Sequence, residues 1–175
     1  NTEEERLLGV SLTGIMDSKL FNDYNTIFLE DGQQVFDGSR VGSILTKLKE
    51  KAIETNKKYS EMLGIPQSTA ITCVKPSGTV SQLVDSASGI HTRHSKYYIR
   101  TVRGDNKDPL TQFMKDSGIP AEPCVMKPDS TTVFSFPTKS PSGAVTRNDM
   151  TALQQLELWK NYALHWCEHK PSVTI

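Results

Sequence analysis

The chain has 175 residues, with 20 Lys+Arg and 20 Asp+Glu, so its formal net charge at pH 7 is +0. This length fits one domain or a piece of a larger protein, and a balanced charge gives no overall attraction to nucleic acid or anionic lipid. No apolar run approaches the roughly 20 residues that cross a membrane, and no signal-peptide pattern opens the chain, so we expect a cytoplasmic protein with no membrane partner.

The first predicted elements are short. Thr2 followed by Glu5 has capping-box spacing and predicts a brief opening helix. Residues 7–16, LLGVSLTGIM, are apolar, and periodicity over so short a run does not decide between a buried strand and a close-packed helix. Residues 24–39, YNTIFLEDGQQVFDGS, are rich in turn formers and predict a loop.

A long helix is predicted from Ser39 to Leu63. Its apolar residues recur at steps of three and four and form one stripe: Val41, Ile44, Leu45, Leu48, Ala52 and Ile53. Gly64 is a candidate for the C-cap, and Pro66 prevents the helix from continuing. Residues 68–74, STAITCV, then predict a short buried strand.

The second half of the chain alternates helices and strands. The predicted elements are a short helix at 82–91, a strand at 96–103, a helix at 108–120, a strand at 131–138, a helix from Asn148 to His169 and a strand at 172–175. The last helix is expected to bury one face: Met150, Leu153, Leu156, Trp159, Ala163 and Trp166. This order is typical of an α/β protein with parallel strand pairs.

The run CVKPSGTVSQ, residues 73–82, lies at a predicted strand-to-helix junction. A helix N-terminus carries N–H groups without partners and a partial positive charge, and an anion satisfies both. Gly78 permits close approach to the backbone, Lys75 adds a positive charge, and three hydroxyls are candidate donors: Ser77, Thr79 and Ser81. The order of residues matches neither a Walker A loop nor a Gly-x-Gly-x-x-Gly turn. The residues alone leave two interpretations open, a phosphate site and an ordinary helix cap.

Residues 91–107, HTRHSKYYIRTVRGDNK, are the most basic stretch, with five Lys/Arg against the single acid Asp105. We favour a solvated strand face with buried aromatics; the alternatives are residues that serve the same phosphate and a single-stranded nucleic-acid site. His91 and His94 lack a third ligand nearby in the sequence, so we expect no metal. The cysteines lie far apart, which favours reduced thiols over a disulfide framework: Cys73, Cys124 and Cys167.

Five segments follow one another in an order found in a known family. They are KPSGTVSQLVDSASGIH, YYIRTVRG, DPLTQFMKDSGIP, TTVFSFPT and SVTI. These segments resemble the adenosylcobalamin-dependent (class II) ribonucleotide reductases, most strongly from Ile71 to Arg103. LLGVSLTGIMDS also resembles the family segment that follows the catalytic loop. The spacing of the later segments is closer to the ribonucleoside-triphosphate reductases than to the larger dimeric enzymes.

The resemblance implies that residues 1–175 are the middle-to-late part of a ten-stranded α/β barrel, either a fragment or one half of a split enzyme. It also implies a cradle for the substrate's phosphates, formed by Pro76, Ser77, Gly78, Thr79, Val80 and Ser81. The complete enzyme would use adenosylcobalamin and a thioredoxin-like reductant, and would convert ribonucleotides to 2′-deoxyribonucleotides by thiyl-radical chemistry. Its partners would include its own remaining segments and no nucleic acid.

The chain departs from the family in its cysteines. The family's radical cysteine lies in an Asn-x-Cys-x-Glu loop, but His165 stands two residues before Cys167. Cys73 and Cys124 match none of the family's cysteine roles either, so we predict no catalytic residue in this chain. Two other functions stay open, an independent phosphate-binding α/β enzyme and a nucleic-acid-binding module built on residues 91–107.

Overall fold

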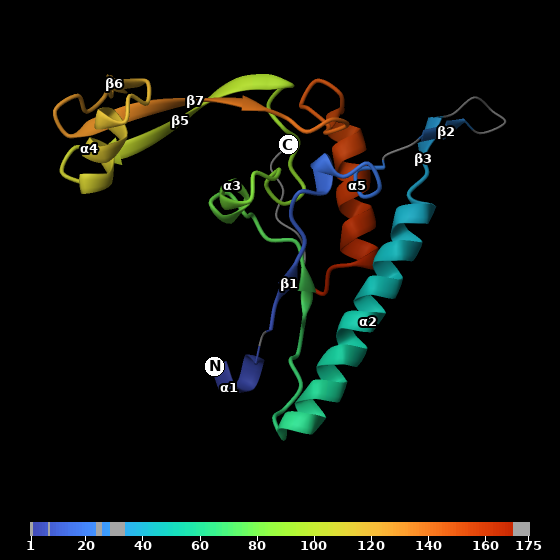
Figure 1. The fold of residues 1–175 in the computed structure, drawn as a ribbon. Helices are drawn as coiled ribbons and strands as arrows, with labels where there is room; N and C mark the ends of the chain where they lie inside the picture. The colour runs from blue at the N-terminus through green and yellow to red at the C-terminus, as the bar shows by residue number, and fades with distance from the viewer. Residues whose placement is uncertain (1, 7, 24–25, 29–33, 170–175) are drawn as a thin grey trace. The chain divides into compact units, whose positions relative to one another are not determined.

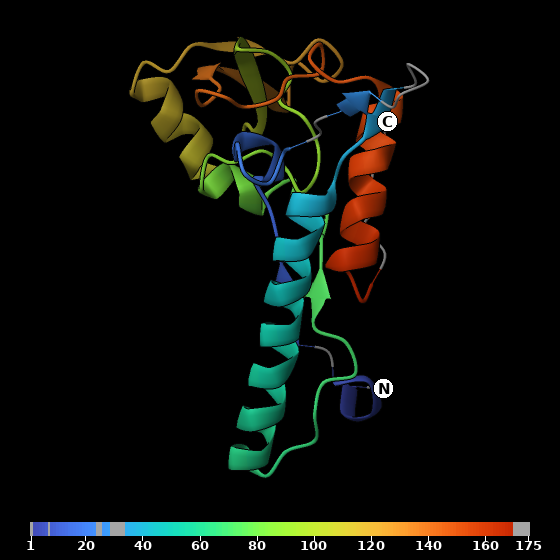
Figure 2. The same ribbon diagram turned by 90° about the vertical axis from the view of Figure 1, so that its right-hand side faces the viewer.

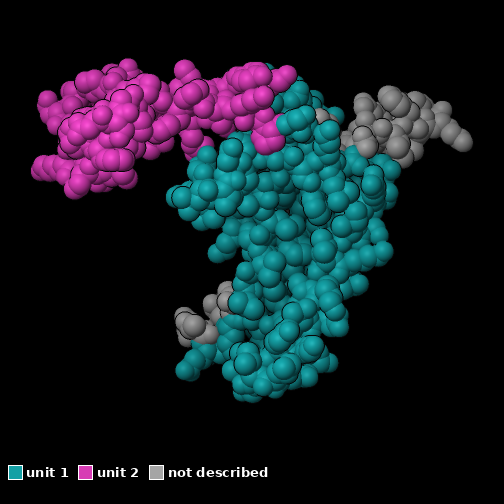
Figure 3. Space-filling view, in the orientation of Figure 1, with its two compact units in different colours: residues 1–93, 142–175 teal, residues 94–141 magenta. Residues whose placement is uncertain are grey.

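A computed structural model describes residues 2–6, 8–23, 26–28 and 34–169. It divides the chain into two compact units, which Figure 3 distinguishes by colour. Unit 1 comprises Asn1–Arg93 and Ser142–Ile175, and unit 2 comprises His94–Pro141. The strand predicted at residues 172–175 lies outside the described residues.

Unit 1 combines helices with short strands (Figure 1). Its described elements are α1 (Thr2–Glu5), β1 (Val10–Ser11), the 3-10 helix η1 (Ile15–Asp17), β2 (Thr26–Phe28), β3 (Gln34–Phe36), α2 (Ser39–Leu63), β4 (Thr72–Cys73), α3 (Val80–Leu83) and α5 (Ala152–His165). The opening helix that the capping-box spacing predicts is confirmed as α1.

Helix α2 covers the predicted residues because its apolar stripe and its end signal agree. Val41 and Leu45 from the stripe are buried, at 1% and 0% exposure. Gly64 ends the helix in the left-handed conformation, with φ of 64°, which glycine adopts at little steric cost. Figures 1 and 2 show α2 packed beside α5. Farther along the stripe, Leu48 and Ile53 are 42% and 39% exposed, so only the first part of the stripe is covered.

Helix α5 is shorter than predicted, and the predicted stripe is confirmed in part: Ala163 and Trp166 are 7% and 3% exposed, and Met150 and Trp159 pack against the core. The Thr151 hydroxyl accepts from the N–H of Gln154 while the Gln154 side chain accepts from the N–H of Thr151, and this capping box starts the helix. The predicted stripe is wrong at Leu153 and Leu156, which are 75% and 40% exposed. The buried residues of the helix are Leu158, Asn161, Tyr162 and Ala163.

The core of unit 1 joins η1, α2, α5 and the loop that follows α3. Its buried residues are Ile15, Met16, Val41, Leu45, Val74, Ala87, Ile90, Val145, Leu158, Tyr162, Trp166 and Cys167. The Tyr162 hydroxyl donates to the carbonyl oxygen of Phe21 at 2.9 Å, and burial raises the pKa of Tyr162. Each fully buried aliphatic or aromatic side chain contributes about 1.5–3 kcal/mol. The core thereby fixes η1 and the loop around Ala87.

Strands β1 and β4 pair in parallel, with Val10 opposite Thr72 and Ser11 opposite Cys73. The predicted strand at residues 68–74 is confirmed in its buried centre, since Thr72 and Cys73 are 0% and 6% exposed. β4 leads directly into the KPSGTVS turn, so this pair positions the turn's first residue.

Two segments near the N-terminus bear on the sequence-based predictions. One contains strands where a loop is predicted, and the other answers the open question of strand or helix. Residues 24–39 contain the antiparallel hairpin of β2 and β3 instead of a loop alone. Strands of three residues are too short to show a clear alternation in the sequence. The apolar run at residues 7–16 contains the exposed strand β1 and then η1, whose Ile15 and Met16 are buried.

Unit 2 is a three-stranded antiparallel sheet in the order β5-β7-β6, with one helix. Its elements are β5 (Tyr97–Asp105), α4 (Pro109–Asp116), β6 (Ala121–Pro123) and β7 (Thr131–Lys139). The predicted β5, α4 and β7 are confirmed, and β6 was not predicted. The expected parallel pairing is wrong for this sheet. Residues 124–130, between β6 and β7, are fewer than the dozen or so that a parallel crossover needs, which explains the antiparallel pairing of these two strands only, because residues 106–130 separate β5 from β7.

The described elements make an α/β structure, as the sequence predicts, with a parallel pair in unit 1 and an antiparallel sheet in unit 2. Within the ranges that the structure describes, no helix is both long and apolar enough to cross a bilayer. The two units differ in burial: the large buried cluster described above belongs to unit 1, which also carries the candidate turn.

Candidate functional site

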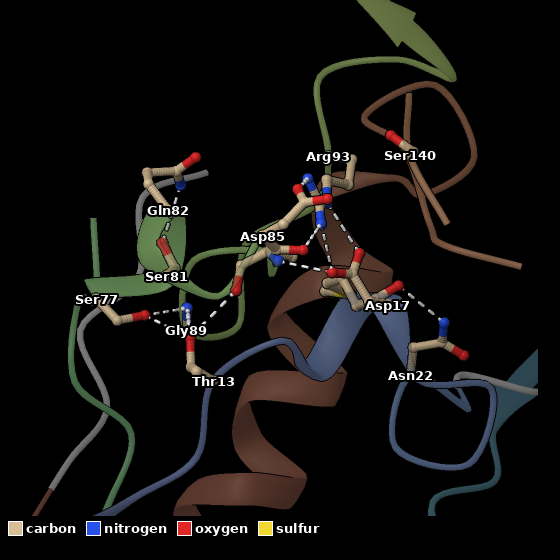
Figure 4. Close-up of polar contacts among 12 residues, drawn as sticks. Thr13, Asp17, Asn22, Ser77, Ser81, Gln82, Asp85, Gly89, Arg93 and Ser140 are labelled. Carbon is tan, nitrogen blue, oxygen red and sulfur yellow. Dashed lines mark hydrogen bonds and ion pairs between the residues drawn. The ribbon is translucent and has the colours of Figure 1, made fainter. Parts of the chain in front are cut away.

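The KPSGTVS turn, residues 75–81, connects the buried strand β4 to the short helix α3 (Figure 4). Its side chains change from buried to exposed along this path. The exposed members are Lys75, Pro76, Gly78, Thr79 and Val80. The strand–turn–helix junction that the sequence predicts is therefore present, and its apex is accessible in unit 1.

The end of α5 holds β4 in place. The carboxylate of Glu168 accepts from the N–H groups of Ile71 and Thr72, at 2.7 and 3.0 Å. The indole N–H of Trp166 donates to the carbonyl oxygen of Cys73 at 2.7 Å. Backbone groups of β4 are thus bonded on one side by β1 and on the other by the chain after α5, which anchors the start of the turn.

The Ser77 side chain points into the protein. Its oxygen accepts from the N–H of Gly89 at 2.9 Å and shares a short hydrogen bond with the Thr13 hydroxyl. The same Gly89 N–H also reaches the Thr13 oxygen at 3.0 Å, and Thr13 donates to the carbonyl oxygen of Ala87 at 3.1 Å. Figure 4 shows these groups meeting beneath the turn. Neither Thr13 nor Gly89 is predicted from the sequence, because no motif connects either of them to the turn.

Ser81 is also bonded internally. It is 0% exposed, its oxygen accepts from the side-chain amide of Gln82 at 3.0 Å, and its hydroxyl reaches the carbonyl oxygen of Gly78 at 3.5 Å. Of the three hydroxyls that the sequence offers as donors, Ser77 and Ser81 are therefore engaged by the protein. Thr79 is the exposed one.

The apex of the turn presents backbone donors. The N–H groups of Gly78, Thr79 and Val80 have no hydrogen-bond acceptor among the residues that the structure describes. Thr79 occupies the N-cap position of α3 but makes no side-chain capping bond. A Cβ added to Gly78 would meet no atom within 4 Å. The turn therefore presents accessible backbone N–H groups, and the Thr79 side chain does not cap the start of α3.

Arg93 is a buried structural residue and does not belong to a basic surface. It is 5% exposed, and its guanidinium lies 2.8 Å from Asp17 and 3.3 Å from Asp85. Asp17 also accepts from the N–H of Ala87 at 2.7 Å. Because a buried cation needs such partners, the interpretation of Arg93 as a phosphate or nucleic-acid ligand is wrong. The cluster instead fixes the loop that carries Gly89.

The remaining basic residues of the 91–107 stretch lie in unit 2: Lys96, Arg100, Arg103 and Lys107. Tyr97 is 63% exposed, so the expectation of buried aromatics is wrong there. The ammonium groups of Lys96 and Lys139 each lie 5.9 Å from the centre of its ring. Cation–π contacts at exposed sites contribute roughly 0.5–1 kcal/mol.

The histidines and cysteines form no cluster within the described part of the chain. His91 contacts the carbonyl oxygen of Ser88, and His94 contacts Ser95. Among the described residues, no three His, Cys, Asp or Glu side chains lie close enough to hold a metal ion. The three cysteines are free and buried: Cys73, Cys124 and Cys167. Hydrogen bonds from the backbone of Lys127 and Met126 lower the pKa of Cys124.

An apolar groove of about 1130 Å³ lies elsewhere in unit 1. Its walls come from α1, the second half of α2 and the residues before β4, and include Leu48, Ala52, Tyr59, Leu63, Ile65 and Ile71. No residue of the KPSGTVS turn lines it. The groove and the turn are therefore separate features of unit 1.

Comparison with known proteins relates this arrangement to one enzyme family. No protein-family profile matches the chain. The adenosylcobalamin-dependent ribonucleoside-triphosphate reductase of Euglena gracilis is 36% identical over 118 residues, which is 67% of this chain and 16% of that protein. The enzyme of the same name from Lactobacillus leichmannii is 28% identical over 99% of this chain and 25% of its own length.

A solved structure agrees with the sequence comparison. The crystal structure of a B12-dependent (class II) ribonucleotide reductase matches with a TM-score of 0.79 and 25% identity, over 99% of this chain and 26% of that chain. The chain thus spans 16% to 26% of the length of these proteins. Since sequence and fold point to the same enzymes, the chain belongs to the adenosylcobalamin-dependent (class II) ribonucleotide reductase family and corresponds to one segment of it.

Proposed function

We propose that this chain is the segment of an adenosylcobalamin-dependent ribonucleoside-triphosphate reductase that binds the phosphates of the ribonucleotide substrate. The proposed cradle is Pro76, Ser77, Gly78, Thr79, Val80 and Ser81. The observation that supports it most is the exposed apex of the turn, where successive backbone N–H groups have no acceptor among the described residues. A phosphate would satisfy these donors together and would lie at the positive end of the peptide dipoles.

Each residue of the cradle has a different part in this proposal. Gly78, Thr79 and Val80 would donate backbone N–H groups, and Thr79 would add its exposed hydroxyl. Lys75 would add a positive charge from the exposed start of the turn. Ser77 and Ser81 would shape the turn through their internal hydrogen bonds. Pro76, whose ring fixes φ, would limit the turn's conformations.

The remaining segments of the same enzyme are the proposed partners of this chain. A two-stranded parallel sheet is normally covered on both faces and extended by further strands, so β1 and β4 suit the interior of a larger ten-stranded α/β barrel. The apolar groove beside α2 offers further surface that such segments would cover.

The cofactor and the reductant would act on other parts of the enzyme. The relatives' names specify adenosylcobalamin; when bound, it would supply the radical chemistry while this chain binds and orients the substrate. We assign none of the described residues to the cofactor. A thioredoxin-like reductant would serve cysteines outside this chain, because Cys73, Cys124 and Cys167 are free and buried.

The test is Gly78→Ala in the complete reductase. The added methyl group meets nothing in the folded chain, so the protein should fold normally. The methyl group would occupy the space that a phosphate oxygen needs, and the loss of one charge-assisted hydrogen bond costs about 1.5–3 kcal/mol. We therefore expect ribonucleotide affinity to fall roughly ten- to a hundredfold, measured by equilibrium binding, with cobalamin affinity unchanged.

Gly9→Ala is the matched control. Gly9 also has no atom within 4 Å of an added Cβ, and it lies outside the turn. This variant should bind the nucleotide as the unmodified enzyme does. If Gly78→Ala folds and binds the nucleotide with unchanged affinity, the turn is not the phosphate site.

A further inference from the structure

We propose that Thr13 is a positioning residue for the phosphate turn: its hydroxyl acts through Ser77 and Gly89 to hold the turn in its binding conformation. This inference rests on the proposed function of the turn. Thr13 lies 64 residues before Ser77 in the sequence, between β1 and η1, and no motif in the sequence connects the two.

The direction of the hydrogen bonds follows from the number of protons available. The Thr13 hydroxyl has one proton, which it donates to the carbonyl oxygen of Ala87. In the bond that joins the two hydroxyls, Ser77 is therefore the donor and Thr13 the acceptor. The Gly89 N–H divides its donation between both oxygens, at 2.9 and 3.0 Å. The Ser77 proton is thus directed at Thr13 and away from the exposed side of the turn.

Gly89 is required for this arrangement. Its φ is +52°, a conformation that residues with a Cβ seldom adopt, and an added Cβ would lie 2.9 Å from the carbonyl oxygen of Lys75. The absence of a side chain allows the Gly89 backbone to approach the start of the turn closely. Thr13 therefore joins two backbone segments, the turn and the 85–93 loop, through its bonds to Ser77, Ala87 and Gly89.

Buried groups fix both the backbone that follows Thr13 and the 85–93 loop to which its hydroxyl is bonded. The N–H of the adjacent Gly14 donates to the carbonyl oxygen of Ala87 at 2.8 Å, and Ile15 after it is buried in the core. On the loop side, Asp17 holds the N–H of Ala87 and pairs with Arg93. Because the surroundings of Thr13 are fixed in this way, the position of its oxygen determines where Ser77 is held.

Thr13 is exposed, yet it has no proton left for a ligand. Its effect on a bound phosphate must therefore pass through Ser77, and this separates a positioning role from direct contact. Two variants that interrupt the same connection should not add their effects, whereas two independent contacts should. A double-mutant cycle measures that difference directly.

The experiment compares Thr13→Val, Ser77→Ala and the double variant in the complete reductase. Equilibrium binding of a ribonucleoside triphosphate and of the matching unphosphorylated ribonucleoside is measured for each. We expect Thr13→Val to weaken triphosphate binding roughly tenfold and to leave nucleoside binding unchanged. The double variant should bind the triphosphate no more weakly than whichever single variant binds it less tightly. Thr13→Ser keeps the hydroxyl, so its triphosphate affinity should stay within about twofold of that of the unmodified enzyme.

The Gly78→Ala variant separates this inference from the proposed function. If Gly78→Ala weakens triphosphate binding and Thr13→Val does not, the phosphate site stands and the role of Thr13 is wrong. If Gly78→Ala has no effect, the site itself is wrong. Additive losses in the double variant, or equal losses for the nucleoside, overturn the positioning role. If Thr13→Val does not fold, the cycle is repeated with Thr13→Ala, and failure of both to fold would show that Thr13 is needed only for folding.

Discussion

At the residue scale, Glu168 offers a test of the contacts that hold β4. Burial raises its pKa, but hydrogen bonds from Thr72 and Ile71 and the charge of Lys49 outweigh this effect, so the pKa lies below its ordinary value of 4.5. A carboxylate whose pKa is lower in the folded than in the unfolded state stabilises the fold above the unfolded pKa. This contribution is lost as the pH falls through the folded pKa.

Glu168→Gln should therefore loosen β4 near neutral pH and have little effect in acid. Because Glu168 is exposed, solvent screening limits the loss to about 1 kcal/mol, which is roughly fivefold in hydrogen exchange. The measurement is exchange of the Ile71 and Thr72 amides in both proteins from about pH 7 to about pH 3. Glu61→Gln, an exposed position on α2, is the control. A difference that is equally large at both ends of this range would contradict the prediction.

Local signals in the sequence identify the turn but not its supports. Gly78 and the surrounding hydroxyl residues are adjacent in the chain, so their composition by itself indicates a possible anion site. Thr13 and Glu168 reach the turn and β4 from 64 and 96 or more residues away. Such partners depend on the tertiary fold, and no spacing rule within one segment predicts them.

At the element scale, the start of α5 depends on the capping box of Thr151. Removing an N-cap hydroxyl costs typically about 1 kcal/mol, because a backbone N–H at the helix start loses its acceptor. We expect Thr151→Ala to speed hydrogen exchange in the first turn of α5 severalfold, and Thr151→Ser to restore protection. If the alanine variant exchanges like the unmodified protein, the capping box does not determine where α5 begins.

The helices and strands are predicted well where the local start and end signals are recognised, and poorly where they are missed or absent. For α2, the apolar stripe and Gly64 agree, and the predicted bounds are confirmed. For α5, a prediction that starts at Asn148 overlooks Thr151 and Gln154 as the start signal. It also places two exposed residues, Leu153 and Leu156, on the buried face. Strands as short as β2, β3 and β6 carry too few residues for any alternation to be recognised.

At the scale of the whole molecule, the isolated chain should not reduce ribonucleotides. It spans at most about a quarter of its relatives' length, and its three free cysteines are buried. We expect no deoxyribonucleotide product when the 175-residue chain is incubated with adenosylcobalamin, a dithiol and a ribonucleoside triphosphate. The complete reductase under the same conditions is the positive control. Product formation by the isolated chain would contradict our assignment of the catalytic residues to other segments.

The hydrogen bonds beneath the turn also bear on the entropy of binding. Since Thr13, Ser77 and Gly89 bond one another within the chain, these hydrogen bonds restrict the conformational freedom of the turn when the protein folds. A nucleotide then meets donors that are already aligned, and little ordering of this segment opposes its association. A variant that lacks these hydrogen bonds would have a more flexible turn before it binds the nucleotide. Its binding entropy should therefore be less favourable, although the contacts in the complex are similar.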